Sequence, residues 1–264
     1  MSLFQMSVAG GVLILFIVVI RALAIHRLPK TTFLALWMIA ALRLLLPLSI
    51  PLPFNIHIGL DVFSDVVQEL PSGNIASTLP GDSPPSYDIG TAVPSPATEH
   101  ISTFEILWLV GVLLLAIYFS ISYFRSMRKF RMSIPDNTPY IPNWLTAHQI
   151  SRPLAVRSSD LISSPLTYGI LHPVILLPKK LDRNDQAALK YVLTHEYVHI
   201  RRFDAITKIL FAAVLCIHWF NPLVWVMYVL ANRDMELSCD AWVIRMLGEK
   251  NRSSYALMLI KMEE

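Results

Sequence analysis

Charged residues are scarce in this sequence of 264 residues: Asp, Glu, Lys and Arg together make up only 16% of it. Soluble domains usually carry about 25%. Hydrophobic residues account for 54%, and the mean hydropathy is +0.51. The composition therefore excludes an ordinary soluble domain and indicates a membrane protein. The formal net charge of +3 is too small to suggest direct binding to nucleic acid.

Cysteine is also rare. The chain has two, Cys216 in an apolar run and Cys239 in a polar segment with a helical pattern. Two widely separated cysteines exclude a disulfide framework and a zinc ribbon built from cysteine pairs.

Three apolar segments predict transmembrane helices. Residues 3–25 are long enough to cross a hydrocarbon core of about 30 Å, and they lack the basic start and the cleavage site of a removable signal peptide. A second apolar segment follows at residues 32–50, so that residues 1–50 hold two spans joined by a short cytoplasmic loop, HRLPK. Residues 106–124 form the third span.

Lys and Arg are absent between Arg43 and Arg125, which orients the chain. Residues 51–105 form a loop rich in Pro and Ser, and six acidic residues lie between Pro51 and His100. The segment RSMRKFR, directly after the third span, carries four basic residues in seven positions. Because short basic loops stay in the cytoplasm, we predict a multi-pass protein of a bacterial-type plasma membrane. Its N-terminus and the acidic loop lie outside, and residues 125–264 form a cytoplasmic domain.

The sequence DRNDQAALKYVLTHEYVHIRRFD predicts a single helix that is capped by Asn184 or Asp185 and contains no later Pro or Gly. His195 and His199 are four residues apart and share a face, so they can bind one metal ion. Glu196 lies beside them, where it can take a proton from the attacking water and pass it to the leaving amine. Zinc suits this chemistry, and we predict one Zn²⁺ per chain.

A third ligand is expected from the segment NRDMELSCDAWVI, which also has a helical pattern. Glu236 completes the His, His, Glu set of a catalytic zinc site. Asp240, one turn further on, is placed to accept a hydrogen bond from a ligand histidine, most plausibly His195. Asp204 either supports the metal site in the same way or pairs with Arg201 or Arg202, and the sequence leaves both alternatives open.

The two motifs must lie on the same side of the membrane, although an apolar stretch separates them. Residues 205–231 are interrupted at Asn221-Pro222. Each arm has about a dozen residues, which is too short to span at 1.5 Å per residue. We therefore predict an apolar hairpin that dips into the membrane and returns the second motif to the first, with the zinc near the cytoplasmic surface. His218, near the tip, is expected to be a buried or interfacial residue rather than a ligand.

The segment SSPLTYGILHPVILLP alternates turn residues with short β-rich runs and predicts a hairpin or a pair of strands. Two interpretations stay open: an ordinary structural hairpin, or an edge strand that binds an extended peptide by strand addition. In the second case the substrate-binding residues are Thr167, Tyr168, Gly169 and Ile170.

Together, SPLTYGILHPVILLP, HEYVHIRRFD, FNPLVWVMYVLANRDMELSCD and the early RLLLP resemble the BlaR/MecR-type family of integral-membrane zinc metallopeptidases. The resemblance covers nearly the whole chain. It implies a mainly α membrane protein with a cytoplasmic α+β, gluzincin-like peptidase domain. It also implies that His195, His199 and Glu236 are zinc ligands, that Glu196 is the base and that Asp240 is the supporting acid. The best-known members sense β-lactams through a C-terminal penicillin-binding domain, which we expect to be missing from this chain.

The resemblance implies a membrane-embedded zinc endopeptidase in a signalling pathway of the antibiotic-response type. Its partners would be membrane lipid and a cytoplasmic protein substrate, such as a DNA-binding repressor or the chain itself, and a homodimer is left open. One alternative is a housekeeping membrane metallopeptidase of the HtpX/Ste24 type. Another is a non-proteolytic signalling module that keeps zinc for structure, although such a module would not need Glu196 beside its ligands.

Overall fold

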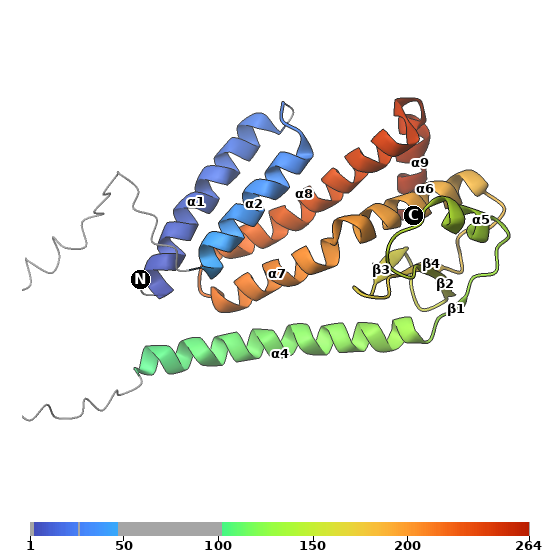
Figure 1. Ribbon diagram of the computed structural model, residues 1–264. Helices are drawn as coiled ribbons and strands as arrows, with labels where there is room; N and C mark the ends of the chain where they lie inside the picture. The colour runs from blue at the N-terminus through green and yellow to red at the C-terminus, as the bar shows by residue number, and fades with distance from the viewer. Residues whose placement is uncertain (1–2, 26, 47–101, 264) are drawn as a thin grey trace, which may run out of the picture. The chain divides into compact units, whose positions relative to one another are not determined.

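A computed structural model describes residues 3–25, 27–46 and 102–263 (Figure 1). The elements in chain order are α1 (Leu3–Ala24), α2 (Lys30–Leu45), α4 (Thr103–Arg131), β1 (Ile134–Pro135), α5 (Tyr140–Ala147), β2 (Ala155–Ser159), β3 (Leu166–Tyr168), β4 (Val174–Pro178), α6 (Gln186–Arg202), α7 (Asp204–Ile217), α8 (Pro222–Leu247), η1 (Glu249–Asn251) and α9 (Arg252–Glu263). These elements belong to one compact unit. The structure is mostly helical with a small sheet. The predicted acidic loop at 51–105 lies almost wholly outside the described residues.

Two helices of the described part of the chain are long and apolar enough to cross a membrane, namely α1 with 22 residues and α4 with 29. The segment predicted as the second span corresponds to α2, which has 16 residues. At 1.5 Å per residue α2 is about 24 Å long, less than the hydrocarbon thickness of about 30 Å. The number of three spans therefore stays a prediction.

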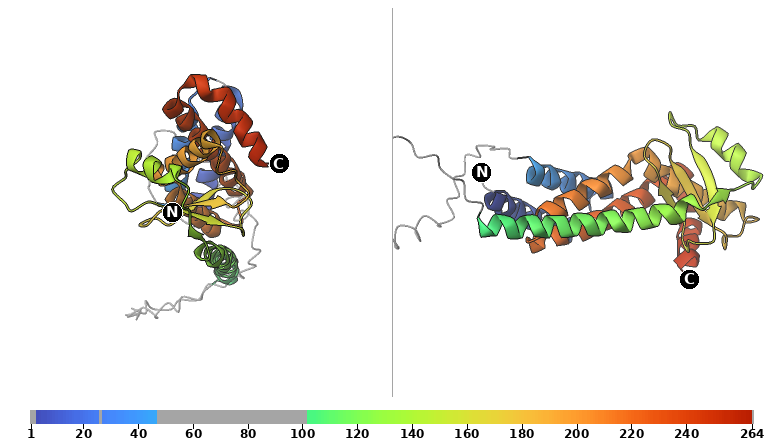
Figure 2. Two further views of the ribbon diagram at one scale, coloured as in Figure 1. Left: turned by 90° about the vertical axis from the view of Figure 1, so that its right-hand side faces the viewer. Right: turned by 90° about the horizontal axis from the view of Figure 1, so that it is seen from below.

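Helices α1, α2, α7 and α8 enclose one apolar cluster. Trp37 and Leu44 of α2, Phe211 of α7 and Met227 of α8 are all fully or almost fully buried in it. Helix α4 runs along α7, and the right view in Figure 2 shows α4 lengthwise beside the bundle. The indole nitrogen of Trp108 in α4 donates to the carbonyl of Ile217 at 2.8 Å. Burial of large side chains between the helices holds this bundle together.

The predicted break in the apolar hairpin is confirmed. The side chain of Asn221 caps α8 by accepting a hydrogen bond from the backbone N–H of Leu223 at 2.9 Å, and Pro222 occupies the first helical turn. The Asn221 amide also donates to the carbonyl of Ser7 at 3.0 Å, which ties the turn to α1. Helix α8 continues unbroken to Leu247, so the second arm of the hairpin and the second motif are a single helix.

The predicted helix with HEYVH begins as expected, because Asp185 caps α6 by accepting from the N–H of Ala188 at 2.9 Å. Its end was predicted wrongly. Helix α6 stops at Arg202, and Phe203 has a left-handed backbone with φ of 59°. Asp204 then begins α7. A left-handed residue closes a helix as glycine usually does, and here it separates two helices that the sequence joins.

The predicted strand pair is also confirmed. The sheet has the order β1-β2-β4-β3, in which β2 and β4 are parallel and β3 pairs with β4 antiparallel. Strand β3 therefore lies at an edge. Gly169 follows it with φ of +84°, and a Cβ there would lie 2.4 Å from the carbonyl oxygen of His172, so this turn requires glycine. One face of the hairpin packs on α6. Ile175 and Leu177 of β4 are buried there in the same apolar cluster as Leu189 and Val192 of α6.

Candidate metal centre

Helices α6 and α8 bring the three predicted ligands together. The Nε2 atoms of His195 and His199 lie 3.1 Å apart. Glu236 Oε2 lies 3.1 Å from His199 Nε2 and 3.8 Å from His195 Nε2. Two imidazole nitrogens and one carboxylate oxygen are ligands that zinc prefers, and ligand atoms about 2.0–2.2 Å from a tetrahedral ion are separated by such distances. The donor set thus fits a catalytic zinc site.

Cys239 is a donor that the sequence analysis did not assign to this site. Its buried thiol forms a second group of candidate ligands with His195 and His199, whose donor atoms all lie within 4.8 Å of one another. The thiol, however, lies 3.9 Å from Nδ1 of His195 and 3.5 Å from the His195 carbonyl oxygen. Glu236 instead faces the side where the two Nε2 atoms meet. The geometry therefore favours Glu236 as the third ligand.

Asp204 contacts a residue from each of the two alternatives that the sequence left open, namely His199 and Arg202. Its Oδ2 lies 2.7 Å from His199 Nδ1, and its Oδ1 lies 3.4 Å from Nε of Arg202. The Asp204 side chain is buried at the junction of α6 and α7. The left-handed backbone of Phe203 turns the chain there and places Asp204 against His199. A carboxylate on Nδ1 fixes the ring and leaves Nε2 directed at the metal position.

Asp240 lies near His195 as predicted, with 3.3 Å between Oδ1 and Nδ1. A residue that the sequence analysis missed makes shorter contacts with both. The hydroxyl of Tyr255, in α9, lies 2.7 Å from His195 Nδ1 and donates to Asp240 Oδ1 at 2.7 Å. No motif spacing marks Tyr255, so no pattern in the sequence assigns it to this site.

The ionisable groups at this centre shift the pKa values of their neighbours. Burial lowers the pKa of the His199 imidazole, but its interactions with Asp204, Cys239 and Glu236 outweigh this effect and raise the pKa to about 11. Burial raises the pKa of Glu236, and its hydrogen bonds to the two histidines reverse this and lower it. Glu196 is buried on α6, and burial raises the pKa of its carboxyl group. A carboxylate with a raised pKa is a stronger base at neutral pH, as general base catalysis requires.

Comparison with known proteins gives a match over residues 1–264 to the family described as BlaR1 peptidase M56. The chain belongs to this family. The predicted resemblance to BlaR/MecR-type peptidases is thereby confirmed, and the family implies a metallopeptidase.

Among curated relatives of this M56 chain, the regulatory protein BlaR1 of Bacillus licheniformis is 32% identical over 165 residues, which are 61% of this chain and 27% of that protein. The methicillin resistance mecR1 protein of Staphylococcus aureus is 23% identical over 273 residues, or 98% of this chain and 46% of that protein. The alignments thus span between a quarter and a half of the relatives' lengths.

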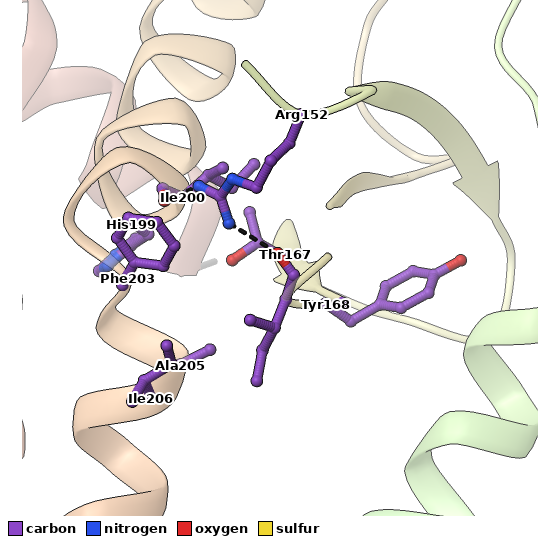
Figure 3. A pocket seen from close by; sticks show the side chains of 10 residues that line it. Arg152, Thr167, Tyr168, His199, Ile200, Phe203, Ala205 and Ile206 are labelled. Carbon is purple, nitrogen blue, oxygen red and sulfur yellow. Dashed lines mark hydrogen bonds between the residues drawn. The ribbon is translucent and has the colours of Figure 1, made fainter. Parts of the chain in front are cut away.

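The four residues predicted to bind substrate line a pocket that His199 of the candidate metal centre also lines (Figure 3). Thr167, Tyr168, Gly169 and Ile170 form one wall, and His199 with the end of α6 forms another. Arg152 joins the two walls, because its guanidinium donates to the carbonyl of Ile170 at 2.6 Å and to that of Ile200 at 2.7 Å. The same group lies 4.1 Å from the centre of the Phe203 ring, a cation–π contact. His218, in contrast, is buried and contacts the carbonyl of Leu44 at 3.0 Å, as expected for a residue outside the site.

Proposed function

We propose that this chain is a membrane-embedded zinc endopeptidase that hydrolyses peptide bonds of a cytoplasmic protein. The proposed substrate is a transcriptional repressor in a signalling pathway of the antibiotic-response type. Cleavage of the chain itself is proposed as a second activity. The observation that carries the proposal is the convergence of His195, His199 and Glu236 beside the buried Glu196. The printed names of the relatives, a regulatory protein and a methicillin resistance protein, support a regulatory role. They favour it over housekeeping proteolysis of the HtpX/Ste24 type.

His195, His199 and Glu236 would hold the zinc. When bound, the metal polarises the scissile carbonyl and lowers the pKa of the attacking water. Glu196 accepts the proton of that water and delivers it to the leaving amine, since one carboxylate can serve as base and then as acid. Asp204 orients His199 throughout. A site with only a structural role would have no use for the carboxylate of Glu196, and this supports hydrolysis over a non-proteolytic module.

Substrate binding is proposed at the outer edge of β3. The strand pairs with β4 on one side only, and its residues Thr167 and Tyr168 line the pocket that reaches His199. An extended peptide that pairs with this edge would run past the metal centre, with its backbone held by hydrogen bonds and its side chains alternating between faces. Arg152 keeps the edge and the zinc helix at a constant separation.

The proposed topology has three spans, with the N-terminus outside and the metal centre at the cytoplasmic surface. The placement of basic residues supports it. Arg21, near the end of α1, contacts Asp234, two residues before Glu236. At the other basic segment, Phe130 of α4 packs on Tyr168 with ring centres 5.5 Å apart. Both basic helix ends thus lie at the end of the bundle that carries the metal centre, and basic segments stay in the cytoplasm.

The substitution Glu196→Ala tests the proposal. We expect the variant to retain zinc but to lose cleavage of a co-expressed candidate repressor. Glu249→Ala, at an exposed position in η1, is the control and should cleave like the wild type. Immunoblots of the repressor and metal analysis of the purified protein report the two properties. Unchanged cleavage by Glu196→Ala would exclude this mechanism.

A further inference from the structure

The two ligand histidines are supported in different ways. His199 makes a direct contact with a carboxylate, Asp204, at 2.7 Å. His195 lies 3.3 Å from the Asp240 carboxylate, and its shorter contact, at 2.7 Å, is with the hydroxyl of Tyr255. That hydroxyl in turn donates to Asp240 at 2.7 Å. The phenol therefore contacts both the histidine and its supporting acid, at shorter distances than the 3.3 Å between those two groups.

The hydrogen-bond directions follow from the single proton of the phenol. Because Tyr255 donates its proton to Asp240, its oxygen can only accept from His195, and Nδ1 of the ring must carry a proton. The lone pair of the neutral imidazole then lies on Nε2, the atom that faces His199 and Glu236. This is the tautomer that a metal ligand needs.

Tyr255 is held rigidly enough to impose this orientation. Its side chain is 2% exposed and lies in the apolar cluster between the sheet and α6. Its ring packs edge-on against Tyr191 of α6, with centres 6.0 Å apart, and lies roughly parallel to the His195 ring at 6.5 Å. Met258, one turn further along α9, is buried in the same cluster. The docking of α9 on α6 thus determines where the hydroxyl lies.

We propose that Tyr255 is a positioning residue of the metal centre, which transmits the support of Asp240 to His195 and makes metal binding depend on the docking of α9. The inference rests on the proposed zinc site. It adds α9 to a centre whose predicted residues lie on α6, on α8 and at the start of α7. Removal of such supporting groups typically weakens metal binding by about tenfold to a hundredfold.

The substitution Tyr255→Phe tests the inference, since it keeps the ring and its packing and removes only the hydroxyl. In detergent-solubilised protein we expect Zn²⁺ to bind at least about tenfold more weakly in competition with a chelating dye. With Co²⁺ in place of zinc, we expect the visible absorption bands to shift because the ligand field changes. Tyr191→Phe is the matched control, because it removes a hydroxyl from the neighbouring ring, and it should bind both metals like the wild type.

A double-mutant cycle of Tyr255→Phe with Asp240→Ala distinguishes two arrangements. Either Asp240 supports His195 through Tyr255, or the two residues support His195 independently. If the support passes through Tyr255, the double variant should bind Zn²⁺ no more weakly than the weaker single variant. Additive losses, or wild-type affinity in Tyr255→Phe, would overturn the inference while leaving the zinc site intact. Failure of the wild-type protein itself to bind Zn²⁺ would instead refute the proposed function. Melting curves of the metal-free variants show whether any loss comes from unfolding.

Discussion

Arg21 of α1 and Asp234 of α8 form a bidentate ion pair inside the helical bundle. Nε of the guanidinium lies 2.8 Å from Oδ2 of the carboxylate, and Nη2 lies 2.8 Å from Oδ1. The indole of Trp37 in α2 donates to the same carboxylate at 2.8 Å. Asp234 is 1% exposed and lies two residues before Glu236. The first two helices are therefore joined by polar contacts to the helix that carries the third ligand.

Breaking this pair should destabilise the bundle strongly. Arg21→Met leaves the Asp234 carboxylate buried without its cation, which typically costs about 3–5 kcal/mol. Arg27→Met, at an exposed position between α1 and α2, should change stability little. Thermal unfolding in detergent compares the two variants. Equal melting temperatures for Arg21→Met and the wild type would mean that the pair contributes nothing to the fold.

The identity of the third ligand can be decided with two variants. Glu236→Ala should lose zinc, whereas Cys239→Ser should keep about one zinc per chain, because the thiol faces the Nδ1 side of His195. Metal analysis of the purified variants measures both. The reverse pattern, with zinc kept by Glu236→Ala and lost by Cys239→Ser, would assign the site to the two histidines and the cysteine.

Zinc affinity should increase with pH between about 7 and 9. The pKa of His199 is raised to about 11, so the metal-free imidazole carries a proton throughout this range. Zinc binds only the neutral ring, and each proton that it displaces should strengthen binding by about tenfold per pH unit. Chelator competition at several pH values gives the slope, and proton release into weak buffer gives an independent count.

Asp204→Asn is the matching variant for that measurement. The amide keeps the size of the side chain but removes the charge that helps to hold the proton on His199. The slope of zinc affinity against pH should therefore become shallower. An affinity independent of pH in the wild type would contradict the assignment of His199 as a protonated residue in the metal-free protein.

Arg152 should affect substrate binding more than chemistry. Arg152→Met removes the hydrogen bonds that join Ile170, after the edge strand, to Ile200 in the zinc helix. We expect KM to rise several-fold, with zinc affinity unchanged, because the pocket wall shifts while the ligands stay in place. Lys190→Met, at an exposed position of α6, is the control. A loss of zinc in Arg152→Met would show that the arginine supports the metal centre itself.

Local signals were sufficient for the parts of this protein that depend on neighbours in sequence. The spacing of His195 and His199 places them on one helical face, and Asp185 and Asn221 cap their helices with their own side chains. The strand pair likewise follows from alternating turn and β-rich residues, whereas the edge position of β3 depends on the pairing of β4 with the distant strand β2. Each of these local features is determined within a few residues, where helix and turn geometry leave little freedom.

Other features needed the folded chain. Glycine and asparagine favour a left-handed backbone and phenylalanine does not, so the sequence did not predict that α6 ends at Phe203. Tyr255 contacts a histidine 60 positions away, and Arg21 contacts an aspartate 213 positions away. The sequence by itself predicted a ligand set and a base, and it located the break in the apolar hairpin, because these features depend on local spacing. Only the tertiary structure brought Tyr255 to His195 and Arg21 to Asp234, because long-range polar contacts depend on how the helices pack and produce no periodic pattern in the sequence.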